Sequence, residues 1–287
     1  MTPTVSVVVP AYNNADFVGE TVRSVLAQTY TDFELIVADH ASSDATWDVL
    51  QEFADDPRVR LLRTPAGGGA KANWDAVSKA ATGELIKLVC GDDVLYPQML
   101  ERQVEQFRAH PRAEVVASRR DIVDAHGTVL VKGRGLGRLQ GEMSGAKALR
   151  KSILAGGNIF GEPMCVMMRR ETLEQVGWWD DRQPYYIDLG TYAHALVRGT
   201  FVAVPETLAG FRVSASQWSV RLTDEQSGQA AQFHARVHEA HPEVVSRLDV
   251  TVGNVMARVA ALRRRLAYAW LGRRMSAPAP SAATSDA

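Results

Sequence analysis

Residues 85–97 read LIKLVCGDDVLYP, an apolar stretch that runs into two adjacent carboxylates, Asp92 and Asp93. A short apolar run bounded by turn residues is typical of a strand buried in a parallel sheet. Two like charges side by side in a cleft cost free energy unless a cation offsets their repulsion. The stretch predicts a buried strand with a charged site at its carboxyl end. The alternative is that the two acids only favour the N-terminus of the helix expected after Pro97.

Around this stretch, the first hundred residues alternate between strand and helix patterns. Strands are expected at 4–10, 33–39, 59–64 and 83–89, and helices at 16–29, 42–54 and 67–82. Repeated strand–helix–strand units imply a parallel, doubly wound sheet, whose ligands bind beyond the carboxyl ends of the strands. We expect the polar residues that follow three of these strands to share one rim: Ala11 to Asn13, Asp39 and His40, and Asp92 and Asp93.

The rest of the chain predicts further strands and helices, among them a hairpin that turns at His126 and Gly127 and a helix that opens at Asp188. A basic amphipathic helix is expected at 246–275, and the composition of 276–287 is typical of a disordered tail. The expected organisation is one domain at 1–245, made of a first part at 1–97 and a second part at 98–245.

Composition excludes several classes of protein. The 287 residues include 32 basic and 33 acidic side chains, so no overall field attracts nucleic acid. The two cysteines, Cys90 and Cys165, lie in apolar stretches and form neither a disulfide framework nor a zinc motif. The N-terminus enters an apolar strand without a leader pattern, and no apolar run reaches membrane-spanning length. These features predict a cytoplasmic protein.

Three motifs, in this order, resemble the nucleotide-binding half of the family 2 glycosyltransferases, whose fold is called GT-A. They are SVVVPAYN at 6–13, ELIVADHASSDAT at 34–46, and GGGAKANWDAVSKAATGELIKLVCGDD at 67–93. The resemblance implies an α/β fold of the GT-A type, Rossmann-like, with a mainly parallel central sheet flanked by helices and a C-terminal helical extension. It also implies an inverting enzyme that uses a nucleoside-diphosphate sugar together with Mg²⁺ or Mn²⁺, with a nucleotide-binding half at 1–97 and an acceptor half at 98–245.

The resemblance assigns roles to residues at the expected rim. It implies that the turn Pro10, Ala11, Tyr12 and Asn13 lies against the nucleotide base and that Asp39 accepts a hydrogen bond from the imide N–H of the base. Lys71 would lie near the base or the phosphates, Asp92 near the ribose or the metal, and Asp93 on the metal. UDP or dTDP is the expected carrier, while the sequence leaves the base open between uracil, thymine and guanine.

A second resemblance lies in YYIDLGTYAHALVRGTFVAVPETLAGFRV at 185–213, which is similar to the helix and strand that supply the family's catalytic base. It implies that Asp188 is the general base, although Asp188 could also cap its helix. The flanking Tyr185, Tyr186 and Ile187 would desolvate the carboxyl and raise its pKa. Four further residues are expected near the phosphates or the acceptor: Arg212, Asn158, Glu162 and Trp179.

Two questions stay open at this point. The basic helix at 246–275 could lie on the inner face of an anionic membrane, which would suit a lipid-linked acceptor, or it could dock on the protein body or on a second subunit. The acceptor itself could be a polysaccharide, a lipid-linked saccharide or a small molecule.

Three other functions make different demands on the sequence. A dinucleotide-dependent oxidoreductase needs Gly-x-Gly-x-x-Gly after the first strand, where this chain has PAYNNAD. A sugar nucleotidyltransferase would need a glycine-rich basic loop at the same place. A non-catalytic sugar-nucleotide-binding module is a further alternative, because Cys90 and Ile187 stand where the family often has acids.

Overall fold

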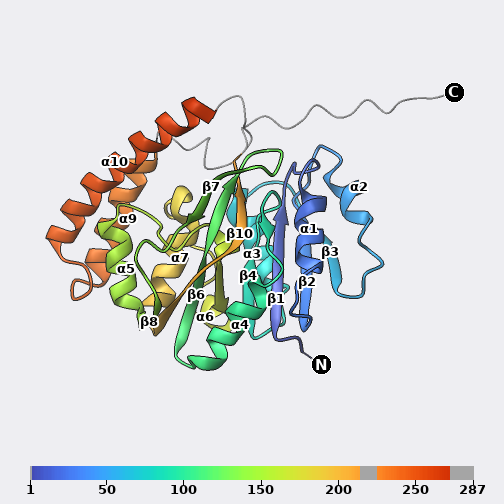
Figure 1. Ribbon diagram of the computed structural model, residues 1–287, viewed down its shortest axis with the longest axis horizontal. Coiled ribbons are helices and arrows are strands. Elements are labelled where there is room, and N and C mark those ends of the chain that lie inside the picture. Colours follow the sequence, from blue (N-terminus) through green and yellow to red (C-terminus); the bar gives the residue numbers. More distant parts are fainter. Residues whose placement is uncertain (1, 214–224, 272–287) are drawn as a thin grey trace.

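The structure is a computed structural model that describes residues 2–213 and 225–271 (Figure 1). The strands are β1 (Val5–Ala11), β2 (Phe33–Asp39), β3 (Val59–Arg63), β4 (Leu85–Leu88), β5 (Val94–Leu95), β6 (Ala113–Val123), β7 (Val129–Arg134), β8 (Gly141–Ser144), β9 (Val166–Arg169) and β10 (Thr200–Arg212). The helices are α1 (Val18–Leu26), α2 (Thr46–Gln51), α3 (Gly69–Lys79), α4 (Met99–Ala109), α5 (Gly145–Leu154), α6 (Arg170–Gln175), α7 (Ile187–Leu196), α9 (Gln226–Ala240) and α10 (Arg247–Leu271). Two short 3₁₀ helices are η1 (Pro163–Cys165) and η2 (Pro184–Tyr186).

One ten-stranded sheet organises the fold, in the order β3-β2-β1-β4-β9-β6-β10-β5, with β7 paired to β6 and β8 to β10. The strands β3, β2, β1 and β4 are parallel, and so are β6 and β10. β9 joins these two parallel sets because it runs antiparallel to both β4 and β6. Helices flank the sheet, which confirms the predicted α/β class.

The register of the parallel strands sets the position of the rim. Ala11 at the end of β1 pairs with Asp39 at the end of β2, and Asp39 pairs with Arg63 at the end of β3. All seven residues of β1 are buried, which agrees with the apolar run in the sequence. β1 lies between β2 and β4, so the strand order reverses there, and an open α/β sheet binds ligands at such a point.

The loops after β1 and β4 touch at this reversal. A Cβ atom at Gly91 would lie 2.8 Å from Oδ1 of Asn14, so only glycine fits there without a shift. The same Oδ1 atom accepts a hydrogen bond from the backbone N–H of Tyr12 at 2.9 Å. The residue before the acid pair is therefore packed against the loop that carries Tyr12.

One residue of β4 departs from the apolar pattern. Lys87 is fully buried, and its Nζ donates to Oε1 of Gln103 at 2.8 Å and to the carbonyl of Val166 at 3.3 Å. Burial lowers the pKa of Lys87 to about 7. These bonds connect β4 to α4 and β9 beneath the rim.

The second half confirms the predicted hairpin and the predicted helix at Asp188. β6 and β7 are antiparallel, and the turn between them carries His126 and Gly127. The predicted strands near the C-terminal end of the domain form a single strand, β10, which spans thirteen residues. Helix α9 was not predicted from the sequence.

The predicted C-terminal helix is present as α10, which packs on α5 and α9 at one end of the sheet (Figure 1). Two glycines allow the close approach, because a Cβ at Gly156 would lie 2.3 Å from the backbone N of Ala257 and one at Gly253 would lie 2.6 Å from the carbonyl O of Ile153. The predicted disordered tail at 276–287 lies outside the described residues.

Candidate active site

The rim begins at the loop after β1. Tyr12 is 54% exposed, and its ring meets the edge of the His40 ring with centroids 6.3 Å apart. Asn13 has a positive φ of 50°, and its Oδ1 accepts a hydrogen bond from the backbone N–H of Ser43 at 2.9 Å. The loop is thus fixed on the neighbouring loop, while the face of Tyr12 stays open to a flat ligand.

At the end of β2, the carboxylate of Asp39 has one oxygen without a hydrogen-bond donor among the described residues. Its side chain is fully buried, and Oδ1 accepts the N–H of Ser42 at 3.2 Å. Oδ2 is buried and has no hydrogen-bond partner among the described residues, and Nε of Arg63 lies 3.7 Å from it. A buried oxygen without a donor marks a place where the N–H of a ligand would be stabilised. The geometry fits the predicted role of Asp39.

The histidine beside Asp39 is used by the protein itself. Nδ1 of His40 contacts the hydroxyl of Thr64 at 2.7 Å, and Nε2 contacts the carbonyl of Gly67 at 2.9 Å. His40 is only 7% exposed. Its two ring nitrogens therefore connect the end of β2 to Thr64 and to the loop that precedes α3.

Lys71 lies in the first turn of α3 and is paired within that helix. Its Nζ contacts Oδ2 of Asp75 at 2.5 Å, and its side chain is 31% exposed. Three glycines at the start of this helix, Gly67 to Gly69, have positive φ. His40 contacts the carbonyl of Gly67, four residues before Lys71, and the ammonium of Lys71 pairs with Asp75. Contact of Lys71 with the base or the phosphates stays a prediction.

The acid pair follows β4, as the sequence predicts. Asp93 is 1% exposed, its Oδ1 accepts the backbone N–H of Arg212 at 3.1 Å, and its Oδ2 is buried without a hydrogen-bond partner in the described part of the chain. Burial and then the charge of Asp92 raise the pKa of Asp93 well above its usual value. Asp92 is half-buried beside it. A buried, unpartnered carboxylate oxygen next to a second carboxylate fits a divalent cation.

The described residues supply no larger metal cluster. No group of three or more His, Cys, Asp or Glu side chains within 2–213 and 225–271 could hold an ion. Mg²⁺ commonly takes only one or two carboxylates from protein and the remaining ligands from water and substrate phosphates. Asp92 and Asp93 therefore fit an ion that binds together with a diphosphate.

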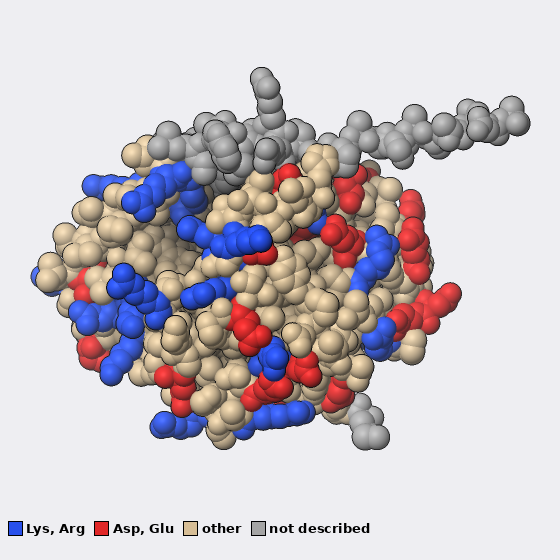
Figure 2. All heavy atoms as spheres, in the orientation of Figure 1, with Lys and Arg blue, Asp and Glu red and all other residues tan. Residues whose placement is uncertain are grey.

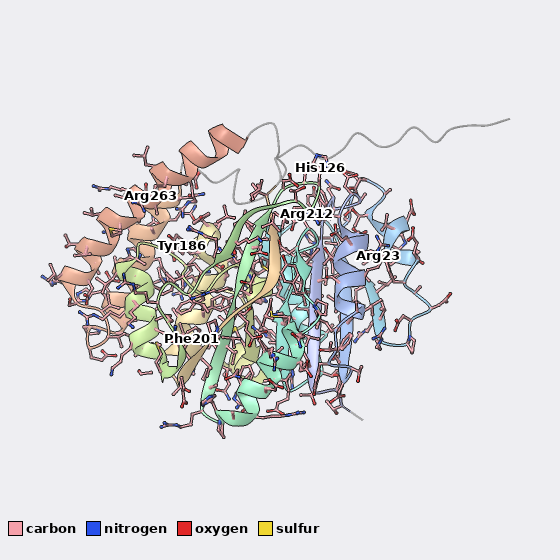
Figure 3. All side chains as sticks on the ribbon, in the orientation of Figure 1. Arg23, His126, Tyr186, Phe201, Arg212 and Arg263 are labelled. Atoms are coloured by element: carbon pink, nitrogen blue, oxygen red, sulfur yellow. The ribbon has the colours of Figure 1, made fainter. Side chains whose placement is uncertain are left out.

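Arg212 lies deeper than the resemblance implies. It is 1% exposed, and Nη2 contacts Oε2 of Glu20 at 2.6 Å while Nε donates to the carbonyl of Asp92 at 2.9 Å. Nη1 donates to the carbonyls of Asp124 and Ala125, in the turn that also carries His126 (Figure 3). The guanidinium is thus engaged with protein oxygens, and its visible role is to hold the acid pair in place.

In the second half of the chain, Asp188 lies in the first turn of α7 and is half-buried. Its Oδ1 accepts the N–H of Leu189 at 2.6 Å, and its Oδ2 accepts Nδ2 of Asn158 at 2.7 Å. Burial, the largest cause, raises the pKa of Asp188 to about 7, and the charge of Glu162 adds to the rise. A carboxyl with this pKa can take up a proton near neutral pH.

Glu162 is fixed by an arginine that the sequence did not single out. Nη2 of Arg120 contacts Oε1 of Glu162 at 2.6 Å, and Nε pairs with Oε2. Asn158 is also tied locally, because its Nδ2 donates to the carbonyl of Gly161 at 2.8 Å. Glu162 and Asn158, both predicted to contact the acceptor, are therefore held in one turn by local contacts, and Asn158 is bonded to Asp188.

Acids that follow β4 and acids from the second half of the chain act electrostatically on the same side chain, Cys90. Burial and then the carboxylates of Asp93, Asp92, Asp188 and Glu162 raise the pKa of this thiol well above its usual value. Four acids from two distant parts of the sequence therefore lie within electrostatic range of one side chain. The residues expected to hold the metal and the expected base therefore all influence this one thiol.

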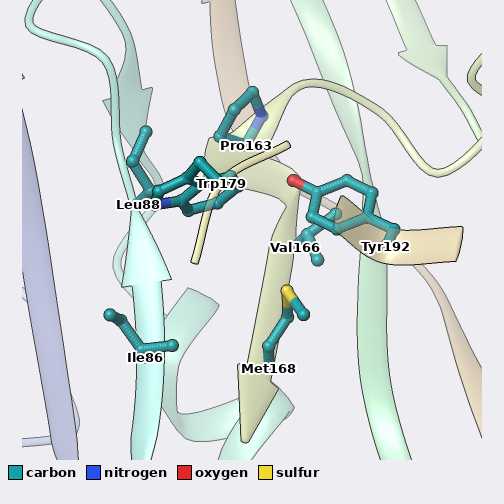
Figure 4. Close-up of a pocket in the computed structure, with 7 residues that line it drawn as sticks. All are labelled: Ile86, Leu88, Pro163, Val166, Met168, Trp179 and Tyr192. Carbon is teal, nitrogen blue, oxygen red and sulfur yellow. The ribbon is translucent and has the colours of Figure 1, made fainter. Parts of the chain in front are cut away.

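Trp179 is an exception among the predicted contacts. It is 3% exposed, and its Nε1 donates to the hydroxyl of Ser78 at 2.9 Å. It lines a small apolar cavity together with six other residues, Ile86, Leu88, Pro163, Val166, Met168 and Tyr192 (Figure 4). Trp179 therefore packs as a core side chain and offers no face to a sugar, because the Ser78 hydroxyl and the apolar core hold it inside.

Three residues near the site were missed by the sequence reading. Arg120 braces Glu162, Arg63 lies beside Asp39, and Asn73 has a buried Oδ1 without a partner in the described chain while its Nδ2 donates to the carbonyl of Ala11 at 3.2 Å. Asn73 falls within one of the quoted motifs, which is a usable signal. Arg120 and Arg63 carry none, because a strand arginine is ordinarily a solvated side chain.

The sequence matches a known protein family and several related proteins. A family model described as glycosyl transferase family 2 matches residues 6–177. An uncharacterized protein of Mycobacterium tuberculosis is 28% identical over 228 residues, 77% of this chain and 70% of that protein. An uncharacterized glycosyltransferase of Nostoc sp. is 33% identical over 177 residues, and the putative glycosyltransferase EpsE of Bacillus subtilis is 32% identical over 127. Those matches cover 60% and 44% of this chain and only 52% and 46% of the two proteins, respectively.

Solved structures show the same fold. TarS of S. aureus in complex with UDP-GlcNAc superposes with a TM-score of 0.62 at 15% identity, covering 93% of this chain and 92% of that chain. A mannosyltransferase from Pyrobaculum calidifontis in complex with GDP-Man and Mn²⁺ superposes with a TM-score of 0.63 at 18% identity, covering 95% and 81%. At these identities the likeness establishes the fold, and it confirms the expected GT-A architecture.

Proposed function

The chain belongs to glycosyl transferase family 2, and from this premise we propose that it transfers a sugar from a nucleoside-diphosphate sugar to an acceptor hydroxyl with inversion at the anomeric carbon. Asp188 is the general base of this proposal, and Asp92 with Asp93 is the cation site. The observation that carries it is that Oδ2 of Asp39, at the end of β2, and Oδ2 of Asp93, just after β4, are both buried without a hydrogen-bond partner among the described residues.

The donor nucleotide is held at the rim by Tyr12 and Asp39. The exposed ring of Tyr12 offers a face on which a base can stack, and Oδ2 of Asp39 is the acceptor for a base N–H. Guanine presents two adjacent N–H groups, which suit both oxygens of a carboxylate, but Oδ1 of Asp39 already accepts Ser42 N–H. A single open acceptor favours the one imide N–H of uracil or thymine, so UDP or dTDP is the proposed carrier.

The diphosphate lies against the acid pair in this proposal. A Mg²⁺ or Mn²⁺ ion held there would neutralise charge on the leaving phosphates. The chain contributes the position of that ion: Arg212 holds the Asp92 carbonyl and Oδ1 of Asp93 from below, which leaves Oδ2 of Asp93 for the ligand.

Asp188 takes the proton of the acceptor. The acceptor oxygen forms its bond to the anomeric carbon on the face opposite the diphosphate, and the bond to the diphosphate breaks with its electron pair. The acceptor proton passes to a carboxylate oxygen of Asp188, whose pKa of about 7 matches this task at neutral pH. Asn158 holds the carboxylate in place through its 2.7 Å hydrogen bond. A saccharide, free or lipid-linked, is the proposed acceptor class.

The test is Asp188→Asn, measured against Asp181→Asn, a matched change at an exposed acid of the preceding loop. Loss of the base should lower kcat by about 10²- to 10⁴-fold, while the affinity for UDP stays unchanged in both variants. Donor hydrolysis in the presence of Mn²⁺ can serve as the assay when the acceptor is unknown.

The same variant has a stability readout that checks its fold. The folded state holds the Asp188 proton up to a pH of about 7, whereas an unfolded carboxyl loses it near its ordinary pKa. Stability contributed by this group therefore falls as pH rises through that window, and Asp188→Asn should resist urea better than the wild type at pH 8. Full turnover by a folded Asp188→Asn variant would refute the base assignment, and binding of a nicotinamide dinucleotide in place of UDP would refute the proposed reaction.

A further inference from the structure

The outer face of α10 carries an exposed apolar stripe. Its members recur at helical spacing and are 36–71% exposed: Leu248, Val252, Val255, Met256, Val259 and Leu262. Among the side chains whose exposure is described, which in α10 end at Arg264, only Tyr12, Val129 and Val131 are other large apolar side chains with comparable exposure. The stripe is therefore the main apolar patch on the described surface, and such patches mark interaction sites.

The opposite face of α10 is already used by the fold. Ala257 is 1% exposed and Ala261 is 8% exposed, and Asp249 pairs with Arg150 of α5 through two contacts of 2.9 Å. This side confirms that the helix docks on the body of the protein. It leaves the apolar stripe exposed on the outer side of the helix.

The charged residues around the stripe indicate which kind of partner the stripe could bind. Arg247, Arg258 and Arg263 are exposed on the same helix. Its only acid, Asp249, is 4% exposed and is held by Arg150 and Ser246. Lys and Arg also predominate at the end of the molecule that α5 and α10 form, at the left of Figure 2. The stripe is therefore flanked by basic side chains, and the one acid of its helix is buried.

A second copy of the chain is a poor match for this surface. A symmetric interface would bring the same patch of both copies together, and each arginine would then face arginines without an acid from α10 to pair with. An anionic lipid surface offers the opposite charge and an apolar layer at the depth that an amphipathic helix reaches. No helix in the described ranges is both long and apolar enough to cross a bilayer, so the expected mode is contact from one side.

We propose that α10 docks the protein on an anionic membrane surface, with the apolar stripe in the headgroup boundary and the arginines on lipid phosphates. This assignment rests on α10 alone and holds whether or not the sugar-transfer proposal is correct. The C-terminal end of α10 rises to the same side of the molecule as the carboxyl ends of β1 and β6 (Figure 1). Docking there would bring the candidate active site toward the lipid surface.

The experiment is flotation of the full chain with vesicles of phosphatidylcholine, alone or with added phosphatidylglycerol. The wild type should float with the anionic vesicles at low salt and be released at high salt. The double variant Val255→Glu and Val259→Glu should lose flotation. Because both positions are exposed, the variant should keep its circular dichroism spectrum and its affinity for UDP.

The matched control is Val129→Glu with Val131→Glu, which adds the same charge at two exposed positions of β7 and should float as the wild type does. Arg258→Ala and Arg263→Ala should each weaken binding to anionic vesicles by roughly fivefold. Failure of the wild type to float at low salt, or equal flotation of the α10 and β7 variants, would overturn the proposal. So would a dimer in sedimentation equilibrium that Val255→Glu with Val259→Glu dissociates while vesicle binding persists.

Discussion

At the scale of single residues, the site is built from acids whose charge the protein disfavours. Burial raises the pKa of both Asp93 and Asp188, yet the two groups differ in what surrounds them. Asp93 has one oxygen fixed by Arg212 N–H and the other unpartnered among the described residues, which suits a bound cation. Asp188 is half-buried and held by Asn158, which suits a base that must reach a substrate.

Asn158 gives a test of this difference. Its hydrogen bond to Asp188 favours the charged carboxylate and lowers the pKa that burial raises. Asn158→Ala should therefore move the acidic limb of the pH–rate profile upward, so that activity near pH 7 falls while activity at higher pH recovers. Asn158→Asp changes the same contact but adds a charge, and should move the limb further. A uniform loss of kcat at every pH would show that Asn158 acts by contact with the substrate instead.

Sequence reasoning predicted the rim residues but not the contacts that hold them in place. Tyr12, Asp39 and Asp93 follow strand ends, and the alternation of strands and helices is visible in the sequence. Arg120 and the buried guanidinium of Arg212 take their roles from contacts with residues far away in the chain, such as Glu162 and Glu20. No local pattern records such contacts. Trp179 was misplaced for the same reason, since the Ser78 hydroxyl that binds its indole is 101 positions away.

At the scale of elements, the apolar runs of β1 and β4 predicted buried strands, and the structure confirms both. α9 was missed although Ala230, Phe233 and Val237 are buried at helical spacing. Small residues between them weaken the contrast between its two faces. The strand β9 could be expected from its sequence, but its antiparallel pairing with both β4 and β6 could not, because pairing depends on contacts between distant segments.

The contact of α5 with α10 can be tested at one glycine. Gly156 and Gly127 have nearly the same φ, 77° and 78°, but a Cβ at Gly156 would lie 2.3 Å from the backbone of α10, whereas nothing lies within 4 Å of one at Gly127. Gly127→Ala should cost about 1–2 kcal/mol from the left-handed backbone alone. Gly156→Ala should lose a further 1–3 kcal/mol or so from overlap.

The measurement is urea unfolding of both variants, with vesicle flotation as a second readout for the position of α10. Equal loss of stability in the two variants would show that α10 is not packed against the loop at Gly156. A larger loss in Gly156→Ala together with altered flotation would support the observed packing.

At the scale of the whole molecule, the sheet brings together residues that the sequence separates. Asp92 and Asp93 follow β4, and Asp188 begins α7, yet all three act on the thiol of Cys90. The resemblance named both sets of acids, and the family match and the GT-A likeness agree with it. The strand order, with β9 inserted between β4 and β6, is the part of this arrangement that no local pattern predicts.

The central claim is that the acid pair after β4 binds a divalent cation together with a nucleoside diphosphate. Isothermal titration of UDP with and without Mn²⁺ tests it most directly, on the wild type, on Asp93→Asn and on Asp55→Asn, an exposed acid outside the site. We predict that Mn²⁺ tightens UDP binding by about tenfold or more in the wild type and in Asp55→Asn, an effect of about 1.4 kcal/mol, and that Asp93→Asn abolishes the tightening. Equal UDP affinity with and without Mn²⁺ in the wild type, or tightening that survives in Asp93→Asn, would contradict the claim.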